Sequence, residues 1–282
     1  MAQLQMPSSP LVSVEWLSQN LHHPQVVVLD ASLKQPQNNT ATFVQQPVQI
    51  PSARFFDIEH VFSHKQSHLP HMLPSPEDFT REARNLGIYR NSLIVVYDNR
   101  GIYASPRAWW MFKAMGHEQV HVLNGGLPQW LAAGFAAEPA TQKEVAKGDF
   151  EAKYNPALVS SRAEVAVALT NSNCSVIDAR PAVRFYGQAP EPRQGLRLGH
   201  MPKAVNIPFN TLIERGLMRT QPELEEIFKR YLSGNRKLIF SCGSGVTACI
   251  TALGAILAGL SNIAVYDGSW SEWGASAELP VV

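Results

Sequence analysis

The sequence predicts two α/β domains in tandem, each a mainly parallel sheet flanked by helices. A chain of 282 residues with 45% hydrophobic content is long enough for two ordinary cores. The same series of strand and helix patterns occurs twice along it. Between the two copies, residues 138–156 are polar, contain prolines and a glycine, and show no sustained apolar period. We therefore expect a first domain over residues 1–137, a linker over 138–156 and a second domain over 157–282.

The first repeated element is a short β-branched run that reaches an aspartate near its end. It occurs as Val26–Ala31 and again as Ser175–Arg180, and apolar runs of this length are typical of buried parallel strands. The next pair is Ile50–Arg54 and Met201–Val205, in which a proline and a following small residue recur in phase. Because strand patterns alternate with helical ones at this spacing, we expect one mainly parallel sheet in each half.

The third repeated element places Asp98 and Cys242 at equivalent positions. Leu93–Asp98 predicts a strand that leads through a glycine-containing turn into a helix ending near Gly116. Lys237–Cys242 predicts the same arrangement before a helix ending near Gly259. The two halves therefore share a scaffold, while the second half alone presents a sulfur nucleophile at this position.

Helix starts also fall at parallel places. Ser75 and Thr220 each precede a proline and acidic residues, which is the pattern of an N-cap followed by a first helical turn. Ser161 with Glu164 is a capping box that opens the second half. Residues 121–126 and 264–269 complete the duplication, each followed by a tryptophan.

Charge and composition limit the possible partners. The 24 Lys and Arg nearly balance the 23 Asp and Glu, so no strong field attracts nucleic acid or an anionic membrane. Residues 1–10 lack the pattern of a secretory signal, and the apolar stretch Val246–Leu260 is too short to cross a bilayer. Three cysteines are too few for a disulfide scaffold, so we expect reduced thiols. These features favour a soluble, cytoplasmic protein that acts on a small molecule.

The loop that begins at Cys242 is the most informative segment, because ligands collect where the strands of α/β sheets end. Gly243 and Gly245 flank Ser244 and allow successive N–H groups to turn inward, while the following helix adds the positive end of its dipole. Such a loop would stabilise a Cys242 thiolate and hold a persulfide. The spacing of these residues alone is equally compatible with two other interpretations, a buried cysteine in a plain turn and a phosphate-binding loop.

The paired halves, the Asp178–Arg180 strand end and the cysteine loop resemble the tandem-rhodanese sulfurtransferases, from about Val12 to Trp273. The resemblance implies that Cys242 carries sulfur as a persulfide. Members of that family that use thiosulfate typically carry cations in this loop. An uncharged loop such as Cys242–Thr247 is instead the pattern of members that use 3-mercaptopyruvate, whose carboxylate lies farther from its sulfur.

The resemblance also implies which residues bind the donor. Arg184 and Arg193 are expected to bind its carboxylate and ketone oxygens, for which a guanidinium fork is well suited. Without the resemblance, both would be interpreted as solvated surface groups. The remaining binding residues that the resemblance implies lie in the loop: Gly243, Gly245, Val246 and Thr247.

A catalytic relay onto Ser244 is the last implication of the resemblance. Its members would be His71 and Glu59, which would help to stabilise and protonate the pyruvate enolate that leaves. Many relatives have aspartate where this chain has Glu59, so the longer side chain departs from the pattern. Taken alone, His71 would be interpreted as a hydrogen-bonded loop histidine.

The expected reaction moves sulfur from 3-mercaptopyruvate to Cys242 with release of pyruvate. A thiol acceptor such as thioredoxin or glutathione, or cyanide, then takes the sulfur. No cofactor, metal, nucleic acid or membrane is expected to take part. Two alternatives share the same cysteine, namely a thiosulfate:cyanide sulfurtransferase and a non-catalytic persulfide carrier that binds one protein acceptor.

Several other features point elsewhere and are given less weight. Four histidines spaced by three or four residues would stack on a helix and suggest zinc, but Pro70 and Pro74 argue against a continuous helix there. These histidines are His60, His64, His68 and His71. A cysteine-based phosphatase would need an arginine at the end of its loop, where this chain has Ala248 and Cys249. We expect Cys249 and Cys174 to be structural, and Arg180 and Arg197 to be weaker candidates than Arg184.

Overall fold

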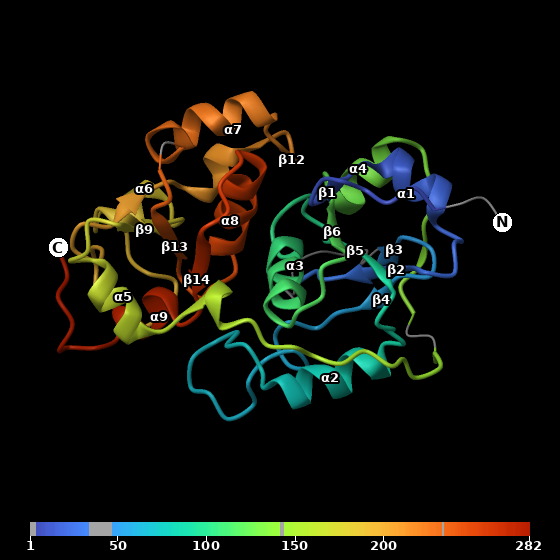
Figure 1. Cartoon of the computed structure of the whole chain (residues 1–282), viewed down its shortest axis with the longest axis horizontal. Coiled ribbons are helices and arrows are strands. Elements are labelled where there is room, and N and C mark those ends of the chain that lie inside the picture. The colour runs from blue at the N-terminus through green and yellow to red at the C-terminus, as the bar shows by residue number, and fades with distance from the viewer. Residues whose placement is uncertain (1–3, 34–46, 142–143, 233) are drawn as a thin grey trace, which may run out of the picture.

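Two α/β units make up the computed structural model, which describes residues 4–33, 47–141, 144–232 and 234–282. Figure 1 shows them side by side, the first in blue and green and the second in yellow to red. Within these ranges each unit contains a five-stranded sheet whose paired strands are all parallel. The predicted fold class is therefore confirmed.

The strand order is the same in both sheets, so each strand has a counterpart at the same place in the other unit. The first sheet runs β1 (Leu11–Val12), β6 (Val120–Leu123), β5 (Leu93–Tyr97), β2 (Val26–Asp30) and β4 (Arg54–Phe55). The second runs β8 (Val159–Ser160), β14 (Ile263–Tyr266), β13 (Lys237–Ser241), β9 (Cys174–Asp178) and β10 (Val205–Asn206).

Helices flank both sheets, as the sequence predicts. The first unit contains α1 (Val14–Asn20), α2 (Pro76–Asn85), α3 (Ser105–Ala114) and α4 (Gly126–Ala132). The second contains α5 (Arg162–Ala168), α6 (Ala182–Phe185), α7 (Gln221–Phe228), α8 (Ala248–Leu257) and α9 (Ser269–Trp273). Short 3-10 turns occur at Pro156–Leu158, Phe209–Leu212 and Lys229–Tyr231. Two small antiparallel ladders pair β3 (Val48–Gln49) with β7 (Glu138–Pro139) and β11 (Ile213–Glu214) with β12 (Leu217–Met218).

The predicted helix starts are confirmed by their capping bonds. The Asp78 N–H donates to Ser75 Oγ over 3.1 Å at the start of α2. At the start of α5, Ser161 and Glu164 form both bonds of a capping box, at 3.3 and 2.7 Å. The Thr220 N–H donates to the Glu223 carboxylate at the start of α7. Each cap satisfies backbone N–H groups that a helix leaves unpaired at its first turn.

The two equivalent loops leave the middle of their sheets. β5 lies between β6 and β2, and β13 lies between β14 and β9. These strands end at Tyr97 and Ser241, one residue earlier than the sequence pattern indicates, so Asp98 and Cys242 are the first loop residues. Because all the strands are parallel, both loops emerge at a carboxyl edge and lead directly into α3 and α8.

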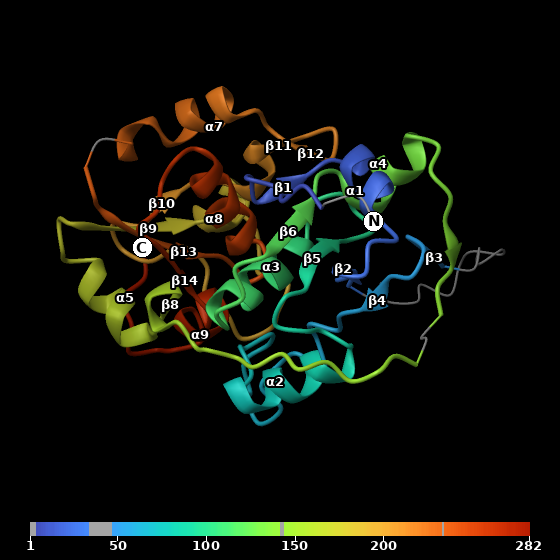
Figure 2. The same ribbon diagram turned by 45° about the vertical axis from the view of Figure 1, so that its right-hand side comes forward.

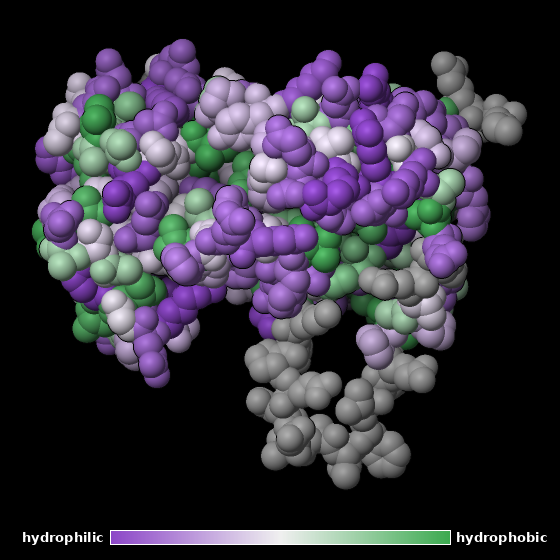
Figure 3. Space-filling view, turned by 90° about the horizontal axis from the view of Figure 1, so that it is seen from below, coloured by the Kyte–Doolittle hydropathy of each residue, from purple (hydrophilic) through white to green (hydrophobic). Residues whose placement is uncertain are grey.

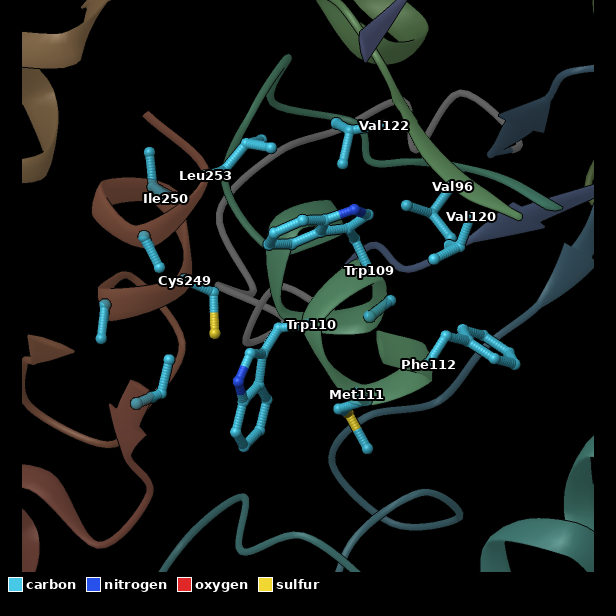
Figure 4. Close-up of a cluster of buried hydrophobic side chains, with 14 of the residues drawn as sticks. Val96, Trp109, Trp110, Met111, Phe112, Val120, Val122, Cys249, Ile250 and Leu253 are labelled. Carbon is cyan, nitrogen blue, oxygen red and sulfur yellow. The ribbon is translucent and has the colours of Figure 1, made fainter. Parts of the chain in front are cut away.

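The helices that follow these loops pack against each other and join the two units. In Figure 4, Trp109 on α3 extends toward α8, which presents Cys249, Ile250 and Leu253. Trp110 points downward in that view, and its indole N–H donates to the Leu158 carbonyl. All five side chains are buried and belong to one apolar cluster that includes residues of both units. Both helices are accordingly apolar over most of their surface, which is the pattern of a helix enclosed on all sides.

The segment between the units runs along the first one, as Figure 2 shows where it passes α2 toward β8. The Phe150 N–H donates to the Ile88 carbonyl, and the Arg84 guanidinium donates to the Phe150 carbonyl. The Lys153 N–H donates to the Met115 carbonyl near the end of α3. These bonds fasten the segment to the first unit instead of leaving it as a free tether.

Hydrophilic side chains predominate on the face seen in Figure 3, with apolar ones scattered between them. Among the described residues, no helix has both the length and the apolar character needed to cross a membrane. The apolar stretch that begins at Val246 forms α8, which is ten residues long.

Candidate functional site

The Cys242 loop is held by the start of α9. The Cys242 N–H donates to Ser269 Oγ over 3.1 Å, and the Cys242 carbonyl accepts from the Trp270 N–H. The Gly243 carbonyl accepts from both the N–H and the hydroxyl of Ser271, at 2.9 and 2.7 Å. The Cys242 side chain is 2% exposed. The sulfur therefore lies in a loop of fixed shape with little contact with bulk water.

The backbone conformation and a close backbone contact require glycine at position 245, and a side chain approaches Gly243. Gly245 has φ +78°, and a Cβ there would lie 2.9 Å from the Asp267 carbonyl oxygen and 3.1 Å from Arg107 Nη1. A Cβ on Gly243 would lie 3.2 Å from Arg184 Nη2. Two guanidinium groups from other segments thus reach a loop that has no cation of its own.

The equivalent loop of the first unit already holds an anion. One carboxylate oxygen of Asp98 accepts from the N–H groups of Tyr103, Ala104 and Ser105 and from the Ser105 hydroxyl, at 2.7 to 2.9 Å. The other oxygen accepts from the Arg100 N–H at 2.9 Å. A loop at this place in the fold therefore converges N–H groups on a negative charge, as expected for a nest of backbone donors.

His71 meets Ser244 across the boundary between the units. His71 Nδ1 lies 3.1 Å from Ser244 Oγ, within hydrogen-bonding distance. His71 Nε2 lies 4.0 Å from the nearest Glu59 oxygen, which is too far for a direct hydrogen bond. The structure thus brings all three residues of the expected relay together but leaves a gap between the histidine and the carboxylate.

Burial lowers the pKa of His71 to about 4, and the nearby cations Arg107 and Arg193 add to this effect. A hydrogen bond with the Ser244 backbone and the negative charge of Asp267 act in the opposite direction. The imidazole is therefore neutral at pH 7. A neutral ring can accept a proton from the Ser244 hydroxyl or donate one to it, depending on its tautomer.

Arg184 lies beside the cysteine loop, and Arg193 lies near His71. Arg184, on α6, pairs with Glu191, whose other oxygen accepts from Arg180 at 2.7 Å. Within the described part of the chain, the buried Nε of Arg184 has no hydrogen-bond partner. Arg193 lines a cavity of about 530 Å³ together with Glu59 and His71. An anion in that cavity would therefore meet Arg193 and the histidine.

Arg180 and Arg197 have structural roles. Arg180 is buried, pairs with Asp178 at 2.8 Å and lies over the Trp270 ring. Arg197 donates to the backbone carbonyls of Trp273, Gly274 and Leu279. Neither guanidinium is free for a ligand, since each is used to fix the chain around α9.

Val246 and Thr247 immediately precede α8, and Thr247 is its N-cap residue. The Val246 side chain is buried in the core, and the backbone carbonyls of both residues accept bonds from the first turn of α8. Their side chains therefore contribute to packing and helix geometry, and the groups they can offer a ligand are backbone N–H groups.

The two other cysteines, Cys249 and Cys174, do not lie in a loop like that of Cys242. Burial raises the pKa of the Cys249 thiol, which donates to the Gly245 carbonyl over 3.2 Å. Cys174 lies at the amino end of β9, away from the edge where Cys242 lies.

Residues 56–75, which hold the four histidines, form turns and no helix, and no group of three potential metal ligands occurs within the described ranges.

The Rhodanese-like domain family matches this chain twice, at residues 13–133 and 161–276. The chain belongs to the rhodanese family. It is 40% identical to the 3-mercaptopyruvate sulfurtransferase of Escherichia coli K12 over 279 residues, covering 98% of this chain and 99% of that protein. It is also 40% identical to a thiosulfate sulfurtransferase of Gallus gallus, covering 93% and 92%. The crystal structure of SseA from Escherichia coli matches with a TM-score of 0.81 and 37% identity, covering 93% of this chain and 99% of that one.

Sequence reasoning missed three charged residues of this rhodanese. Glu191 bridges Arg180 and Arg184, and Arg107 pairs with Asp267 at 2.6 Å across the boundary between the units. One signal was available for Arg107, because it is a single charged residue within the apolar first turns of α3, and a buried arginine requires an acidic partner. Which acid pairs with it depends on how the two domains dock.

Proposed function

We propose that this protein is a 3-mercaptopyruvate sulfurtransferase in which Cys242 is the nucleophile. The Cys242 thiolate attacks the donor sulfur, the bond between that sulfur and carbon breaks, and its electron pair passes to the pyruvate enolate. Protonation of the enolate carbon gives pyruvate and leaves a Cys242 persulfide. The observation that carries this proposal is that Arg184 approaches the Cys242 loop at Gly243 while His71 contacts Ser244 of the same loop.

The arginines supply the binding energy in this proposal. Arg184 Nε is buried and has no hydrogen-bond partner among the described residues, so the proposal requires the guanidinium to shift toward the carboxylate, and Glu191 balances part of its charge. Arg193 adds a second cation at the cavity that His71 lines. A 2-oxo acid places its carboxylate and ketone oxygens in one plane, which suits recognition by guanidinium groups.

The proton chemistry is assigned to His71 and Ser244. The neutral imidazole can hold the Ser244 hydroxyl in one orientation, so that the hydroxyl donates toward charge that develops on the enolate oxygen. N–H groups of Gly243, Gly245, Val246 and Thr247 would surround the reacting sulfur, as N–H groups surround Asp98 in the first domain.

The second half of the reaction transfers the outer sulfur to an acceptor. We propose a thiol, such as that of glutathione or thioredoxin, or cyanide. A cytoplasmic location fits a protein whose three cysteines are all free thiols. We also propose domain limits of 1–137 and 157–282, which lie close to the two family matches.

A thiosulfate:cyanide sulfurtransferase is the second candidate, because the chain is also 40% identical to a thiosulfate sulfurtransferase, over 93% of its length. Thiosulfate is a dianion, and it would rely on Arg184 because the loop has no cation. A persulfide carrier without turnover is the third candidate, and it predicts slow reaction with free donors.

Two measurements separate these candidates: the mass of the protein after reaction with the donor, and its kinetics with two donors. Intact-mass measurement after addition of 3-mercaptopyruvate should reveal one added sulfur atom, which is absent in Cys242→Ser and present in Cys249→Ser. kcat/KM should be at least about tenfold higher for 3-mercaptopyruvate than for thiosulfate, and Arg184→Ala should lower it by about 10- to 100-fold through lost charged hydrogen bonds. Arg162→Ala, which changes the exposed arginine at the first position of α5, is the control. Pyruvate release without a mass change contradicts the covalent step, and a preference for thiosulfate selects the second candidate.

A further inference from the structure

We propose that Arg107 and Asp267 form an interdomain positioning pair that holds His71 against Ser244. This inference rests on the proposed function, since it concerns the histidine assigned to proton chemistry there. Arg107 belongs to α3 of the first domain, and Asp267 follows β14 of the second domain. Their side chains are 0% and 4% exposed, and Arg107 Nη1 lies 2.6 Å from Asp267 Oδ1.

Arg107 joins the two halves of the relay through its two terminal nitrogens. Nη2 donates to the backbone carbonyl of His71, while Nη1 donates to Asp267 and lies 3.4 Å from the Gly245 carbonyl. His71 is the residue that bears the imidazole, and Gly245 follows Ser244 in the cysteine loop. One planar group therefore bonds to the backbone of His71 and to the backbone of the residue that follows Ser244.

Asp267 completes the arrangement from the other domain. Its Oδ2 accepts from the Leu73 N–H over 2.6 Å, two residues after His71. His71 bears the first of these two anchors and has φ +60°, a left-handed conformation that a non-glycine residue retains where its surroundings hold it. The short segment His71–Leu73 is thus fixed at both ends by one ion pair.

The equivalent position in the first domain provides a matched control. Asn124 occupies the place of Asp267 in the duplicated sequence, and its side chain also reaches across the boundary, accepting from the Met218 N–H over 3.0 Å. This second bond does not involve His71 or the cysteine loop. Its loss tests the effect of weaker domain docking without any change at the proposed relay.

The test compares kcat and KM for 3-mercaptopyruvate in Arg107→Lys, Asp267→Asn and Asn124→Ala. Lysine keeps the charge but cannot bond to three oxygens with a planar fork. We expect Arg107→Lys to lower kcat by about 10- to 100-fold, because the histidine is displaced, with KM changed by less than about threefold. Asp267→Asn should act in the same way, and Asn124→Ala should leave kcat unchanged. If Arg107→Lys does not fold, Asp267→Asn carries the test.

A double-mutant cycle with His71→Asn distinguishes positioning from a general structural role. If Arg107 acts through His71, adding Arg107→Lys to His71→Asn should lower kcat by less than about twofold further. If the fold-decrease in kcat of the double variant equals the product of the two single decreases, this proposal is overturned, while the role proposed for His71 and Ser244 still stands. Wild-type kcat in His71→Asn itself overturns the relay of the proposed function, and this inference with it.

Discussion

His71 is the residue at which burial, backbone conformation and charge act together. Its ring is largely buried, its backbone is left-handed, and its neighbours Arg107 and Arg193 are cations. Each of these features is unfavourable for a protonated histidine or for an isolated chain. They persist because the ring contacts Ser244 and the backbone is bonded to Arg107. The consequence is a histidine that stays neutral at pH values where most histidines are charged.

Protonation of His71 should therefore make stability depend on pH. The folded pKa is about 4 and the ordinary value is 6.5, so the unfolded chain binds more protons between these values. The free energy of unfolding should fall as the pH drops from 6.5 toward 4, by up to about 3 kcal/mol from this residue. Urea titrations across this range should give a smaller decrease for His71→Asn than for the wild type. Parallel pH profiles for the two proteins contradict the assignment.

Glu59 illustrates how far a sequence motif predicts geometry. The motif places an acid near His71, and the structure does so, but at 4.0 Å and with a side chain that is one-third exposed. The distance depends on side-chain length and on how the loop over residues 57–60 folds. Asp57 bonds to the N–H groups of Glu59 and His60, so it is occupied within that loop. The pattern of residue types alone does not contain this information.

At the scale of the elements, the duplication made most of the fold predictable. Strands such as β5 and β13 and the helix starts at Ser75 and Thr220 follow from local patterns that occur twice. The cysteine loop was predictable for the same reason, since it lies within one element pair. Arg107 and Glu191 were not predicted, because their partners are set by tertiary docking. Arg107 and Asp267 are 160 residues apart in the chain.

The Asp98 loop allows a test of the anion-binding geometry that the two loops share. Asp98→Asn should lower the free energy of unfolding by about 2 to 3 kcal/mol, because one of its five bonds is lost and the rest lose their charge. Asp149→Asn is the control, an exposed carboxylate that accepts from the Arg90 N–H. Chemical denaturation measures both. Equal small effects in the two variants contradict a special role for the loop.

At the scale of the whole molecule, the two domains share one core through α3 and α8. We expect the domains to unfold together, with the same opening free energy for the central strands β5 and β13 in native-state hydrogen exchange. Trp109→Ala should lower stability by about 3 to 5 kcal/mol and make the two opening free energies differ, since it removes a large apolar side chain from the contact between domains. Trp130→Ala deletes an equally buried indole within the first domain alone. Trp130→Ala should lower stability without making the opening free energies of β5 and β13 differ to the same extent. A similar difference between the two strands in both variants contradicts the shared core.

The fastened linker has a consequence for how the protein works. Lys153 and Asn155 bond to carbonyl groups at the end of α3, immediately before the chain enters the second domain. The domains are thus held at the helix interface and again by the connecting segment, so a wide hinge opening would break both. We expect the whole catalytic cycle to run in the closed molecule. Donor and pyruvate then exchange by small side-chain movements, and a protein acceptor must bring its thiol to the surface of an enzyme that does not open to receive it.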